Sequence, residues 1–462
     1  MSMLEKLALP EIRELIHNQE LETLGEVLNR WLPADIADLL ADLSSFEDTI
    51  AFTCLKPELA ARTFGYLPGS SQQQLLRVLP EAELARIMNE LAPDDRTFFL
   101  EGLPNEEVER LLTLLAPENQ RIARSLLSYG QGTVGRLMTP DFIAVLEGWT
   151  IQEVLAHVRR VGQDSETLNA VYVTDDQQHL IDDIRMREIL LAEPEALVRT
   201  LMDRQYVSLA VTDAEMVAVE QFRKYDRTVL PVIDRRCVLL GVVTVDDVLD
   251  VAEETATRDI QKFGGLEALD EPYISTPLLS MVQKRASWLI ILFVGEMLTA
   301  SAMGAYEKQI EKAVVLALFV PLIISSGGNS GSQAATLIVR AIAVGEVRLR
   351  DWWLVMRREL FSGLLLGLVL GAIGFLRISL WSAFSNIYGE HWILVAITVA
   401  VSLVGIVLWG TLAGSMLPFL LKRLGFDPAT SSAPFVATLV DVTGLVIYFT
   451  VATIVLSNTL LK

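Results

Sequence analysis

Long apolar segments dominate the last two fifths of the chain. Five of them occur, at about residues 286–306, 313–341, 358–381, 391–420 and 432–458. A helix needs ~20 apolar residues to cross the ~30 Å hydrocarbon core of a bilayer. The pattern therefore predicts a membrane domain of five helices over residues 276–462. The last four segments are long enough to tilt or to extend beyond the bilayer.

Short amphipathic stretches and regularly spaced prolines mark residues 1–128. Beyond Pro10, the prolines of this part fall at positions 33, 57, 68, 80, 93, 104 and 117, and the last six are 11 to 13 residues apart. Because proline is tolerated in the first turn of a helix and stops the helix before it, this spacing predicts short helices stacked into a superhelix. Asp94 and Asp95 would start one of these helices, where they would either complement the helix dipole or bind a metal.

Short apolar strands alternate with helices over residues 129–255. Residues 135–140 are echoed by residues 198–203, and residues 168–175 by residues 227–234. An internal repeat of about 60 residues predicts two copies of one α/β fold. It resembles a tandem pair of cystathionine-beta-synthase (CBS) domains, and the second copy is the closer match. Residues 256–275 then form a connector, which we expect to be helical up to Gly264 and Gly265.

The charge divides the chain where the hydropathy does. Residues 1–275 carry 49 acids and 25 bases, whereas residues 276–462 carry 9 acids and 13 bases. The acidic excess of the first part argues against a nucleic acid as partner, and it suits either a bound cation or a solvated acidic surface. Cys54 and Cys237 have no paired spacing, so we expect them to be reduced, buried thiols of a cytosolic region.

Basic residues beside the apolar segments predict the orientation. Three groups of them share one side of the membrane if all five segments span it, namely Lys284 with Arg285, the arginines at 340–358, and Lys422 with Arg423. The positive-inside rule puts this side in the cytoplasm. The N-terminus has no apolar stretch of signal-peptide type, which agrees with a cytoplasmic first part, and we expect the C-terminus outside.

A few polar and small residues interrupt the apolar segments. Asp441 lies in the fifth segment, Glu296 midway along the first, and Gly328 and Asn329 in the glycine-rich middle of the second. A carboxylate in hydrocarbon is costly, so it faces a pore or a partner, and no arginine or lysine lies at a comparable depth to pair with Asp441. For Asp441, Glu296 and Asn329, the alternative to ion conduction is a structural hydrogen bond between helices.

The ligand chemistry of the membrane part favours a hard cation. This part has no cysteine and one histidine, His391, near a membrane surface, so it provides poorly for copper or zinc. Carboxylate, amide and backbone oxygens suit magnesium, which sheds its water reluctantly. In a symmetric dimer, two copies of Asp441 would favour a divalent cation. No nucleotide-hydrolysis, serine-hydrolase or zinc-protease motif occurs, so nothing in the sequence predicts an enzyme.

A second acidic set lies in the second CBS-like copy and just after it. Its members are Asp226, Asp246, Asp247, Asp250, Glu253, Glu254 and Asp259. Several of them lie three or four residues apart on one expected helix, where like charges repel. A bound cation would relieve this repulsion, and a solvated acidic face is the alternative.

Four segments make the chain resemble the MgtE family of magnesium channels and transporters over nearly its whole length. They are residues 224–232, 243–250, 327–333 and 436–445. The resemblance implies a homodimer with a central pore, an ion-selective site formed by Asp441 with the backbone near Ala437, and Asp427 near the cytoplasmic pore mouth. It also implies a plug helix around residues 252–266 and a pore held shut by cytosolic magnesium between acids of the N-terminal domain, the CBS pair and the plug.

The chain departs from the family's sensor pattern at three positions. Met216, Thr255 and Arg258 stand where family members can carry acids. Four acids still match the pattern, namely Asp226, Asp247, Asp250 and Asp259. We therefore expect fewer or weaker sensor sites. Nucleotide binding like that of some CBS pairs would take ATP and use Arg187 of the first copy.

The sequence thus predicts a multidomain membrane protein. Its parts are an N-terminal α-superhelical domain, tandem α/β CBS domains, a connecting plug helix and a five-span α-helical domain. We expect a dimeric magnesium permeation protein of a bacterial-type inner membrane, gated from the cytoplasm. The alternative is a membrane-anchored regulatory protein that senses nucleotide or cation through its CBS pair and transports nothing. Asp441 and Asn329 favour transport, because a mere anchor has no use for a carboxylate in its fifth span.

Overall fold

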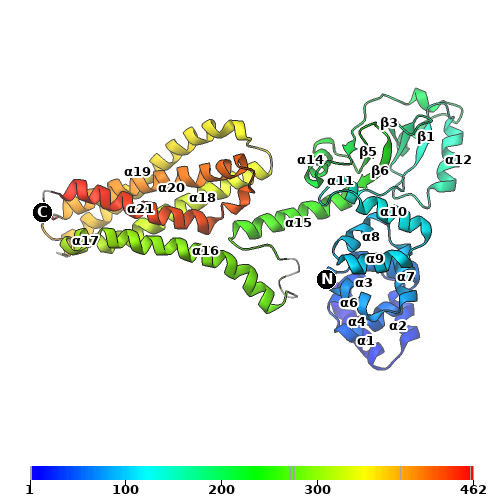
Figure 1. Cartoon of the computed structure of the whole chain (residues 1–462), viewed down its shortest axis with the longest axis horizontal. Coiled ribbons are helices and arrows are strands. Elements are labelled where there is room, and N and C mark those ends of the chain that lie inside the picture. Colours follow the sequence, from blue (N-terminus) through cyan, green and yellow to red (C-terminus); the bar gives the residue numbers. More distant parts are fainter. Residues whose placement is uncertain (1–2, 270–272, 274–275, 386, 458, 461–462) are drawn as a thin grey trace. The chain divides into compact units, whose positions relative to one another are not determined.

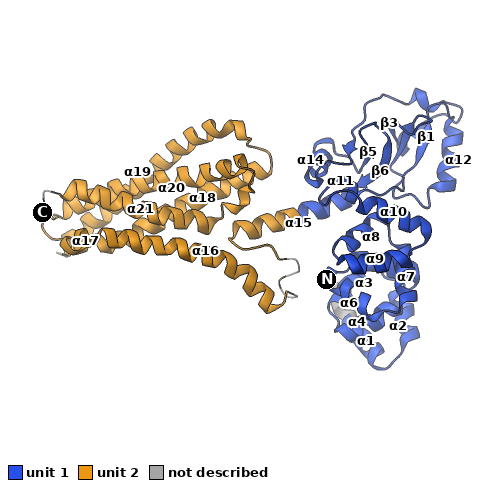
Figure 2. Cartoon of the chain, in the orientation of Figure 1, with its two compact units in different colours: residues 1–254 blue, residues 255–462 orange. Residues whose placement is uncertain are grey.

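The computed structural model describes residues 3–269, 273, 276–385, 387–457 and 459–460. They form two compact units, residues 1–254 and residues 255–462, which are coloured separately in Figure 2. The first unit holds short helices followed by two small sheets, and the second holds long apolar helices (Figure 1).

Ten helices of the described residues form the superhelical start of the first unit. They are α1 (Met3–His17), α2 (Leu21–Leu28), α3 (Pro33–Ala41), α4 (Ser45–Thr53), α5 (Pro57–Tyr66), α6 (Gly69–Val78), α7 (Glu81–Glu90), α8 (Pro93–Glu101), α9 (Asn105–Leu114) and α10 (Pro117–Leu127). Proline is the first residue of α3, α5, α8 and α10 and immediately precedes α6, α7 and α9. The predicted helix starts are confirmed, because the missing N–H of proline costs nothing in a first turn.

One hydrogen bond recurs every 24 residues along this superhelix. Gln72 Nε2, Arg96 Nη1 and Gln120 Nε2 each donate to the carbonyl oxygen eight residues earlier, over 2.7, 3.1 and 3.0 Å. The acceptors lie in the last turns of α5, α7 and α9, where helix carbonyls have no partner within the helix. Helices α6, α8 and α10 are therefore each fastened to the preceding helix by a side chain in the same place.

Two three-stranded sheets follow, and they have the same topology. The first contains β1 (Ala144–Leu146), β2 (Ala170–Thr174) and β3 (Leu180–Arg185), and the second β4 (Leu209–Ala210), β5 (Val229–Ile233) and β6 (Leu239–Thr244). In each sheet the central strand pairs parallel with the first strand and antiparallel with the third, and the register shifts after Val173 or Val232. The helices of this region are α11 (Val134–Leu137), α12 (Ile151–Val161), α13 (Met186–Leu191) and α14 (Glu215–Tyr225). The predicted tandem α/β repeat is confirmed.

The expectation of two buried thiols is wrong for Cys237. This residue lies in the turn between β5 and β6 with a φ of 63°, and it is exposed, whereas Cys54 is half-buried. A tight turn between two strands lies at the surface, because its backbone polar groups need water.

The connector begins as part of a longer helix than predicted. The sequence predicted a connector that is helical from about residue 256, its start overlapping the end of the CBS pair, and α15 (Val245–Phe263) runs unbroken from the end of β6 through this region. No glycine or proline interrupts residues 245–263, so nothing breaks the helix there. It ends before Gly264 and Gly265 as predicted, and Gly265 has a φ of 74°, which glycine adopts readily. Residues 270–272 and 274–275 of the predicted connector lie outside the described residues.

Five helical segments of the second unit are long and apolar enough to span a membrane, as predicted. They are α16 (Leu278–Ala305), η2 (Val314–Phe319) continued by α18 (Val320–Ala343), η3 (Leu349–Asp351) continued by α19 (Trp352–Phe384), α20 (Trp392–Arg423) and α21 (Ala433–Leu456), with the short α17 (Glu307–Lys312) after α16. The first and third begin earlier than predicted, because Lys284 and Arg285 lie about two turns into α16 and Arg357 lies in the second turn of α19, and basic residues are not part of an apolar run.

Helix α20 is the centre of the membrane unit. It packs against α18, α19 and α21, whereas α16 contacts mainly α21. Only 6% of the apolar window of α16 is buried, compared with 28–50% in the other four segments. Four of the five segments thus form a packed bundle, whereas most of the surface of α16 is not covered by other described residues of the chain.

Glycines explain how closely α18 and α20 approach. A Cβ atom on Gly410 would lie 2.6 Å from the Gly327 carbonyl oxygen, and one on Gly331 would lie 3.1 Å from the Gly410 carbonyl oxygen. The two backbones are therefore in direct contact, and a side chain at these positions would force them apart. The glycine-rich middle of the second apolar segment is a packing surface for α20.

We expect Gly410→Ala to lower the unfolding temperature of the detergent-solubilised protein by several degrees. The added methyl would press on a backbone oxygen, and overpacking of this kind costs ~1–3 kcal/mol. Gly405→Ala is the matched control on the same helix, because its Cβ would lie an ordinary 3.4 Å from Ile447 Cγ2. Equal unfolding temperatures for the two variants, measured by differential scanning fluorimetry, would contradict the packing argument.

Candidate functional site

Three residues predicted for the pore lie together between α18 and α21. A Cβ atom on Gly328 would lie 3.3 Å from Asp441 Oδ1 and 3.4 Å from Ala437 Cβ. Asp441 and Ala437 are one turn apart on α21, so both face the same stretch of α18. Because Gly328 has no side chain, no α18 side chain at this position stands between the helix backbone and the Asp441 carboxylate.

The Asp441 carboxylate has no counter-charge in the described part of the chain. Its side chain is half-buried, and no described residue donates a hydrogen bond to it or forms an ion pair with it. A structural carboxylate between helices would have such a partner, because an unpaired charge in hydrocarbon costs several kcal/mol. The remaining candidates are a cation, water or another chain, and the structural alternative raised by the sequence is disfavoured.

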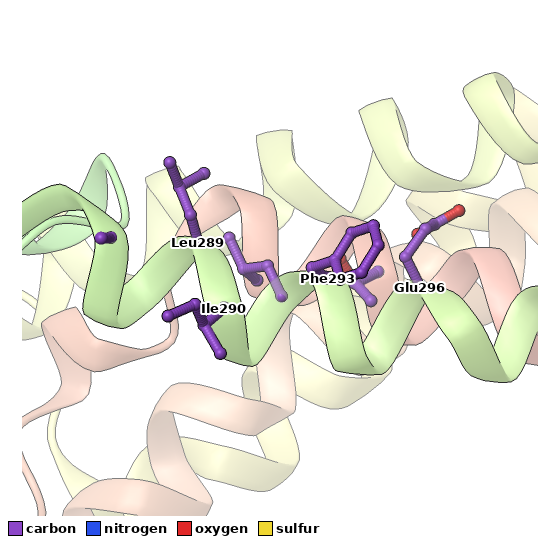
Figure 3. Close-up of a pocket in the computed structure, with 7 residues that line it drawn as sticks. Leu289, Ile290, Phe293 and Glu296 are labelled. Carbon is purple, nitrogen blue, oxygen red and sulfur yellow. The ribbon is translucent and has the colours of Figure 1, made fainter.

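Asn329 and Glu296 do not join this group of contacts. Asn329 is exposed, and its Nδ2 donates over 3.3 Å to Ser325 Oγ, one turn earlier on the same helix. Glu296 is exposed on α16, in a pocket of about 640 Å³ that also holds Thr438 of α21. Figure 3 shows Leu289, Phe293 and Glu296 along one side of α16. One carboxylate therefore lines an otherwise apolar surface on the least covered helix.

Asp427 precedes α21 and already has a cationic partner. Lys262 Nζ of α15 lies 2.7 Å from Asp427 Oδ2, while Asp427 Oδ1 accepts the backbone N–H of Ala429 over 2.9 Å. Asp259 lies one turn before Lys262, close enough for the charges of Lys262 and Asp427 to act on its carboxyl group. Desolvation and the charge of Asp427 raise the pKa of the Asp259 carboxyl, whereas Lys262 and Arg258 oppose this. The predicted pore-mouth acid Asp427 and the predicted sensor acid Asp259 thus lie beside cationic side chains of the chain itself.

The end of α15 is held against the start of two membrane helices. A Cβ atom on Gly265 would lie 2.7 Å from Trp288 Nε1 and 3.2 Å from Pro434 Cγ. The Trp288 indole N–H donates to Ser432 Oγ over 3.2 Å, and Lys284 Nζ donates to the Ala268 carbonyl oxygen over 2.5 Å. The close approach explains why glycine stands at 265, and it brings Lys262 within reach of Asp427.

A second site lies in the first unit, between α8 and the first turn of α15. Asp94 is buried, and its Oδ1 has no hydrogen-bond partner among the described residues. Burial, reinforced by the charges of Asp247 and Glu166, raises the pKa of Asp94 well above its ordinary value. Burial also raises the pKa of Asp247 to about 7, although Thr244 Oγ1 donates to its carboxylate over 2.7 Å. Carboxyl groups from two different helices, α8 and α15, thus lie in one partly buried region.

More acids surround this pair. Desolvation and the charges of Asp246 and Asp250 raise the pKa of Asp95, and Asp246 and Asp95 likewise act on Glu166. The sequence predicted the part played by α8 and α15, but Glu166 and Asp141 were missed. Both lie in irregular segments outside the helices and strands, where no periodicity indicates which residues fold back onto a distant helix. We refer to Asp94, Asp95, Asp141, Glu166, Asp246, Asp247 and Asp250 as the acidic cluster.

The acidic cluster does not form a ready-made coordination sphere. No group of three or more His, Cys, Asp or Glu side chains in the described residues is arranged to hold a metal ion directly. Carboxylate oxygens at wider spacing suit a cation that keeps part of its water shell, as Mg²⁺ does. The unpartnered buried oxygen of Asp94 fits this chemistry, because a water ligand of such an ion would donate to it.

Other predicted site residues are not brought to either place within the chain. Asp226 is exposed and caps α14 in a left-handed conformation with a φ of 50°. Arg187 is exposed on α13, and Met216 is exposed on α14. Aspartate is among the residues that tolerate this cap conformation, so the residue type at 226 has a local reason of its own.

Family models cover most of the chain. A model described as a divalent cation transporter, MgtE, matches residues 320–451, the MgtE intracellular N domain matches residues 31–132, and the CBS domain matches residues 134–195 and 198–254. The magnesium transporter MgtE of Thermus thermophilus is 39% identical over 458 residues, which cover 98% of this chain and 99% of the relative. MgtE of Bacillus subtilis is 27% identical over 440 residues, or 95% of each protein.

Two solved structures resemble the cytosolic part. A crystal structure of the cytosolic domain of the Mg²⁺ channel MgtE in complex with ATP is 32% identical, with a TM-score of 0.51, and covers 53% of this chain and 99% of that one. A crystal structure of the soluble part of a magnesium transporter is 23% identical, with a TM-score of 0.51, and covers 55% of this chain and 99% of that one. It shows that the cytosolic part of this chain has the same fold as that protein.

Because the pKa values of Asp94 and Asp247 are raised, the contribution of the acidic cluster to folding stability depends on pH in a defined direction. Folding favours the protonated form of such groups, so their contribution to stability is present below the ordinary pKa of ~4 and is lost as the pH rises through the folded-state value. For Asp247 that value is about 7. Without divalent cations, we expect the unfolding temperature of the cytosolic transition to fall by several degrees from pH 5 to pH 8.

Differential scanning calorimetry of the full-length protein in EDTA measures this. The double variant Asp94→Asn/Asp247→Asn is the control and should flatten the pH dependence, because the amides do not titrate. A wild-type transition that becomes more stable over this range would contradict the assignment of the two carboxyls.

Proposed function

Because the chain belongs to the MgtE family of divalent cation transporters, we propose that it conducts Mg²⁺ across a membrane through a pore formed by two copies of the chain. It is a multi-pass membrane protein. The observation that carries the proposal is the half-buried Asp441 carboxylate, which rests against Gly328 and has no counter-charge among the described residues. A passing cation supplies the missing charge.

The geometry around Asp441 suits a hydrated divalent ion. One carboxylate per chain, together with backbone and water oxygens, can hold Mg²⁺ without removing its whole water shell. Two chains related by a two-fold axis would present two copies of Asp441 to one ion, which favours a divalent over a monovalent cation. An inside-negative potential of 100 mV contributes about 4.6 kcal/mol to the entry of each Mg²⁺, so downhill permeation needs no chemical fuel.

The second copy would cover α16 and the neighbouring face of α18. Glu296 and the apolar residues of the 640 Å³ pocket are open on this chain, and α16 is the least buried of the five segments. A carboxylate exposed to lipid would be costly, so a protein or aqueous surface is the better environment for Glu296. Asn329 is likewise exposed one residue from Gly328, where a pore between two chains would give its amide an aqueous neighbour.

We propose that the first unit is cytoplasmic and the C-terminus lies outside, in a bacterial-type inner membrane. The support is the basic residues at the starts of α16 and α19 and at the end of α20, which fall on one side of a five-span domain. In this orientation the acidic cluster meets cytosolic Mg²⁺, and Lys262 with Asp427 lies at the cytoplasmic end of α21.

Closure would depend on charge neutralisation in the cytosolic part. Mg²⁺ in the acidic cluster would remove the repulsion between α8 and α15 and favour the packed arrangement of the first unit. At the end of α15, Lys262 and Arg258 already offset part of the charge of Asp427 and Asp259. We therefore propose that the first unit controls how far the pore closes as cytosolic Mg²⁺ rises. We also propose that Met216, Thr255 and Arg258 weaken this sensor.

ATP is a second candidate ligand of the CBS pair. The support is the relative whose cytosolic domain was crystallised in complex with ATP and resembles this chain at 32% identity. Arg187 is exposed on α13 and available to a phosphate. A membrane-anchored sensor without transport is the alternative, and an absence of Mg²⁺ flux into liposomes that hold the purified protein would favour it.

We expect Asp441→Ala and Asp441→Asn to reduce Mg²⁺ uptake into liposomes by roughly tenfold or more, since a unit charge in a partly dry site contributes a few kcal/mol. The asparagine variant keeps the shape and removes the charge, so it separates attraction from packing. Asp351→Asn is the matched control, because this acid caps η3 through Arg348 N–H at 2.9 Å, away from α21. Wild-type uptake by folded Asp441→Ala protein would exclude Asp441 from permeation.

We expect millimolar Mg²⁺ to protect the first unit of the full-length protein from subtilisin. A ligand that binds only the packed form stabilises it by mass action. Asp247→Ala/Asp250→Ala should lose most of this protection, whereas Glu188→Ala, an exposed acid on α13, should retain it. Protection of the double variant equal to that of wild type would show that the ion binds elsewhere.

A further inference from the structure

Arg96 departs from the helical repeat in which it stands. Gln72, Arg96 and Gln120 occupy equivalent positions in three successive helix pairs and make the same bond to a carbonyl eight residues earlier. Only the middle one is charged. Glutamine therefore satisfies the structural requirement of this position, and the bond alone gives no reason for an arginine.

Burial of the Arg96 guanidinium also has a high free-energy cost. Arg96 is 1% exposed, and its Nε has no hydrogen-bond partner among the described residues. Arginine stays charged in proteins, and taking a charge out of water costs several kcal/mol unless another charge offsets it. A buried guanidinium with spare donors implies a nearby negative group that benefits from it.

The negative groups are Asp141 and Asp94. The charges of both act on Arg96, and in turn Arg96 opposes the rise in the pKa of Asp141 that burial causes. Asp141 follows α11, and its carbonyl oxygen accepts the backbone N–H of Glu166 over 2.8 Å, so it is tied to another member of the acidic cluster. Arg96 thus puts a fixed positive charge from the superhelix beside acids of the first CBS copy.

An ion pair joins the same two segments. Glu101, at the end of α8, lies 3.5 Å from Arg136 of α11, and both side chains are largely buried. Arg136 also donates to the carbonyl oxygens of Leu127 and Tyr129 over 2.9 and 2.8 Å. Helix α8 therefore meets the CBS region through an ion pair at Glu101 and through the charge of Arg96, which acts on Asp141 of the acidic cluster.

We propose that Arg96 is an internal cation that holds the superhelix against the CBS pair when no Mg²⁺ is bound and sets the Mg²⁺ concentration at which the acidic cluster fills. It is a positioning residue. Its charge lowers the repulsion among the empty carboxylates, and the same charge lowers the attraction of the cluster for a divalent ion. This inference rests on the proposed Mg²⁺ sensing in its second part only.

The test compares full-length variants in detergent by subtilisin cleavage of the first unit, in EDTA and across a Mg²⁺ titration. Arg96→Gln keeps the bond to Met88, as Gln72 and Gln120 show for their positions, and removes the charge. We expect its cleavage in EDTA to be roughly fivefold faster and its Mg²⁺ midpoint roughly threefold lower than in wild type, within the usual coupling of neighbouring charges. Arg96→Lys, which keeps the charge, should stay near wild type.

Two controls separate this from general effects. Arg124→Gln removes an exposed arginine that pairs with Glu109 on the neighbouring helix, and should change neither quantity. In Arg96→Gln/Asp141→Asn, one charge of each sign is removed, so the EDTA rate should return toward wild type. If the double variant stays as fast as Arg96→Gln, the substitution has damaged the fold and the proposal fails.

The remaining outcomes are equally decisive. Identical EDTA rates and Mg²⁺ midpoints for Arg96→Gln and wild type would overturn the proposal. A faster rate with a higher midpoint would also overturn it, because that is the result of lost packing alone. If wild type shows no Mg²⁺ protection at all, the proposed sensing fails, while the EDTA rates still decide whether Arg96 holds the two parts together.

Discussion

The free-energy cost of taking a carboxylate out of water governs both candidate sites of this protein. Asp441 is half-buried in a membrane helix, and Asp94 is buried between a superhelix and a CBS domain. Neither carboxylate has a hydrogen-bond partner for the oxygen that faces its site among the described residues. Such groups are costly when ionised unless a proton or a positive charge neutralises them, and a mobile divalent cation is the neutralising charge that we propose for both.

The chain offsets other acids with charges of its own. Lys262 pairs with Asp427 at the end of the connecting helix, the charge of Arg96 acts on Asp141, and Arg136 pairs with Glu101. These fixed cations differ from a metal ion, because they do not leave when the cytosolic concentration falls. A protein that conducts and senses the same ion needs some carboxylates left free and others neutralised permanently. This chain contains both kinds of carboxylate.

Close helix packing makes the arrangement at Asp441 possible. Gly328 lets the carboxylate reach the backbone of α18, and Gly327, Gly331 and Gly410 let α18 and α20 touch. Without the hydrophobic effect to drive helices together in lipid, small residues gain their stabilisation from van der Waals contact between backbones. The same glycine run therefore serves both the stability of the bundle and the exposure of backbone to the proposed ion site.

Local patterns in the sequence determined the elements of this protein, and the tertiary structure decided which of their side chains meet. Proline spacing fixed the helix starts at Pro57 and Pro93, and apolar length fixed the five spans, because each depends on residues close together in the chain. Resemblance to a family placed Asp441 beside Ala437. No local pattern could show that Gly328 lies next to Asp441 or that Lys262 binds Asp427. The burial of Arg96 and the approach of Asp141 and Glu166 to α8 likewise depend on how loops fold back over long distances, where the physical cause is packing between elements and not periodicity within one.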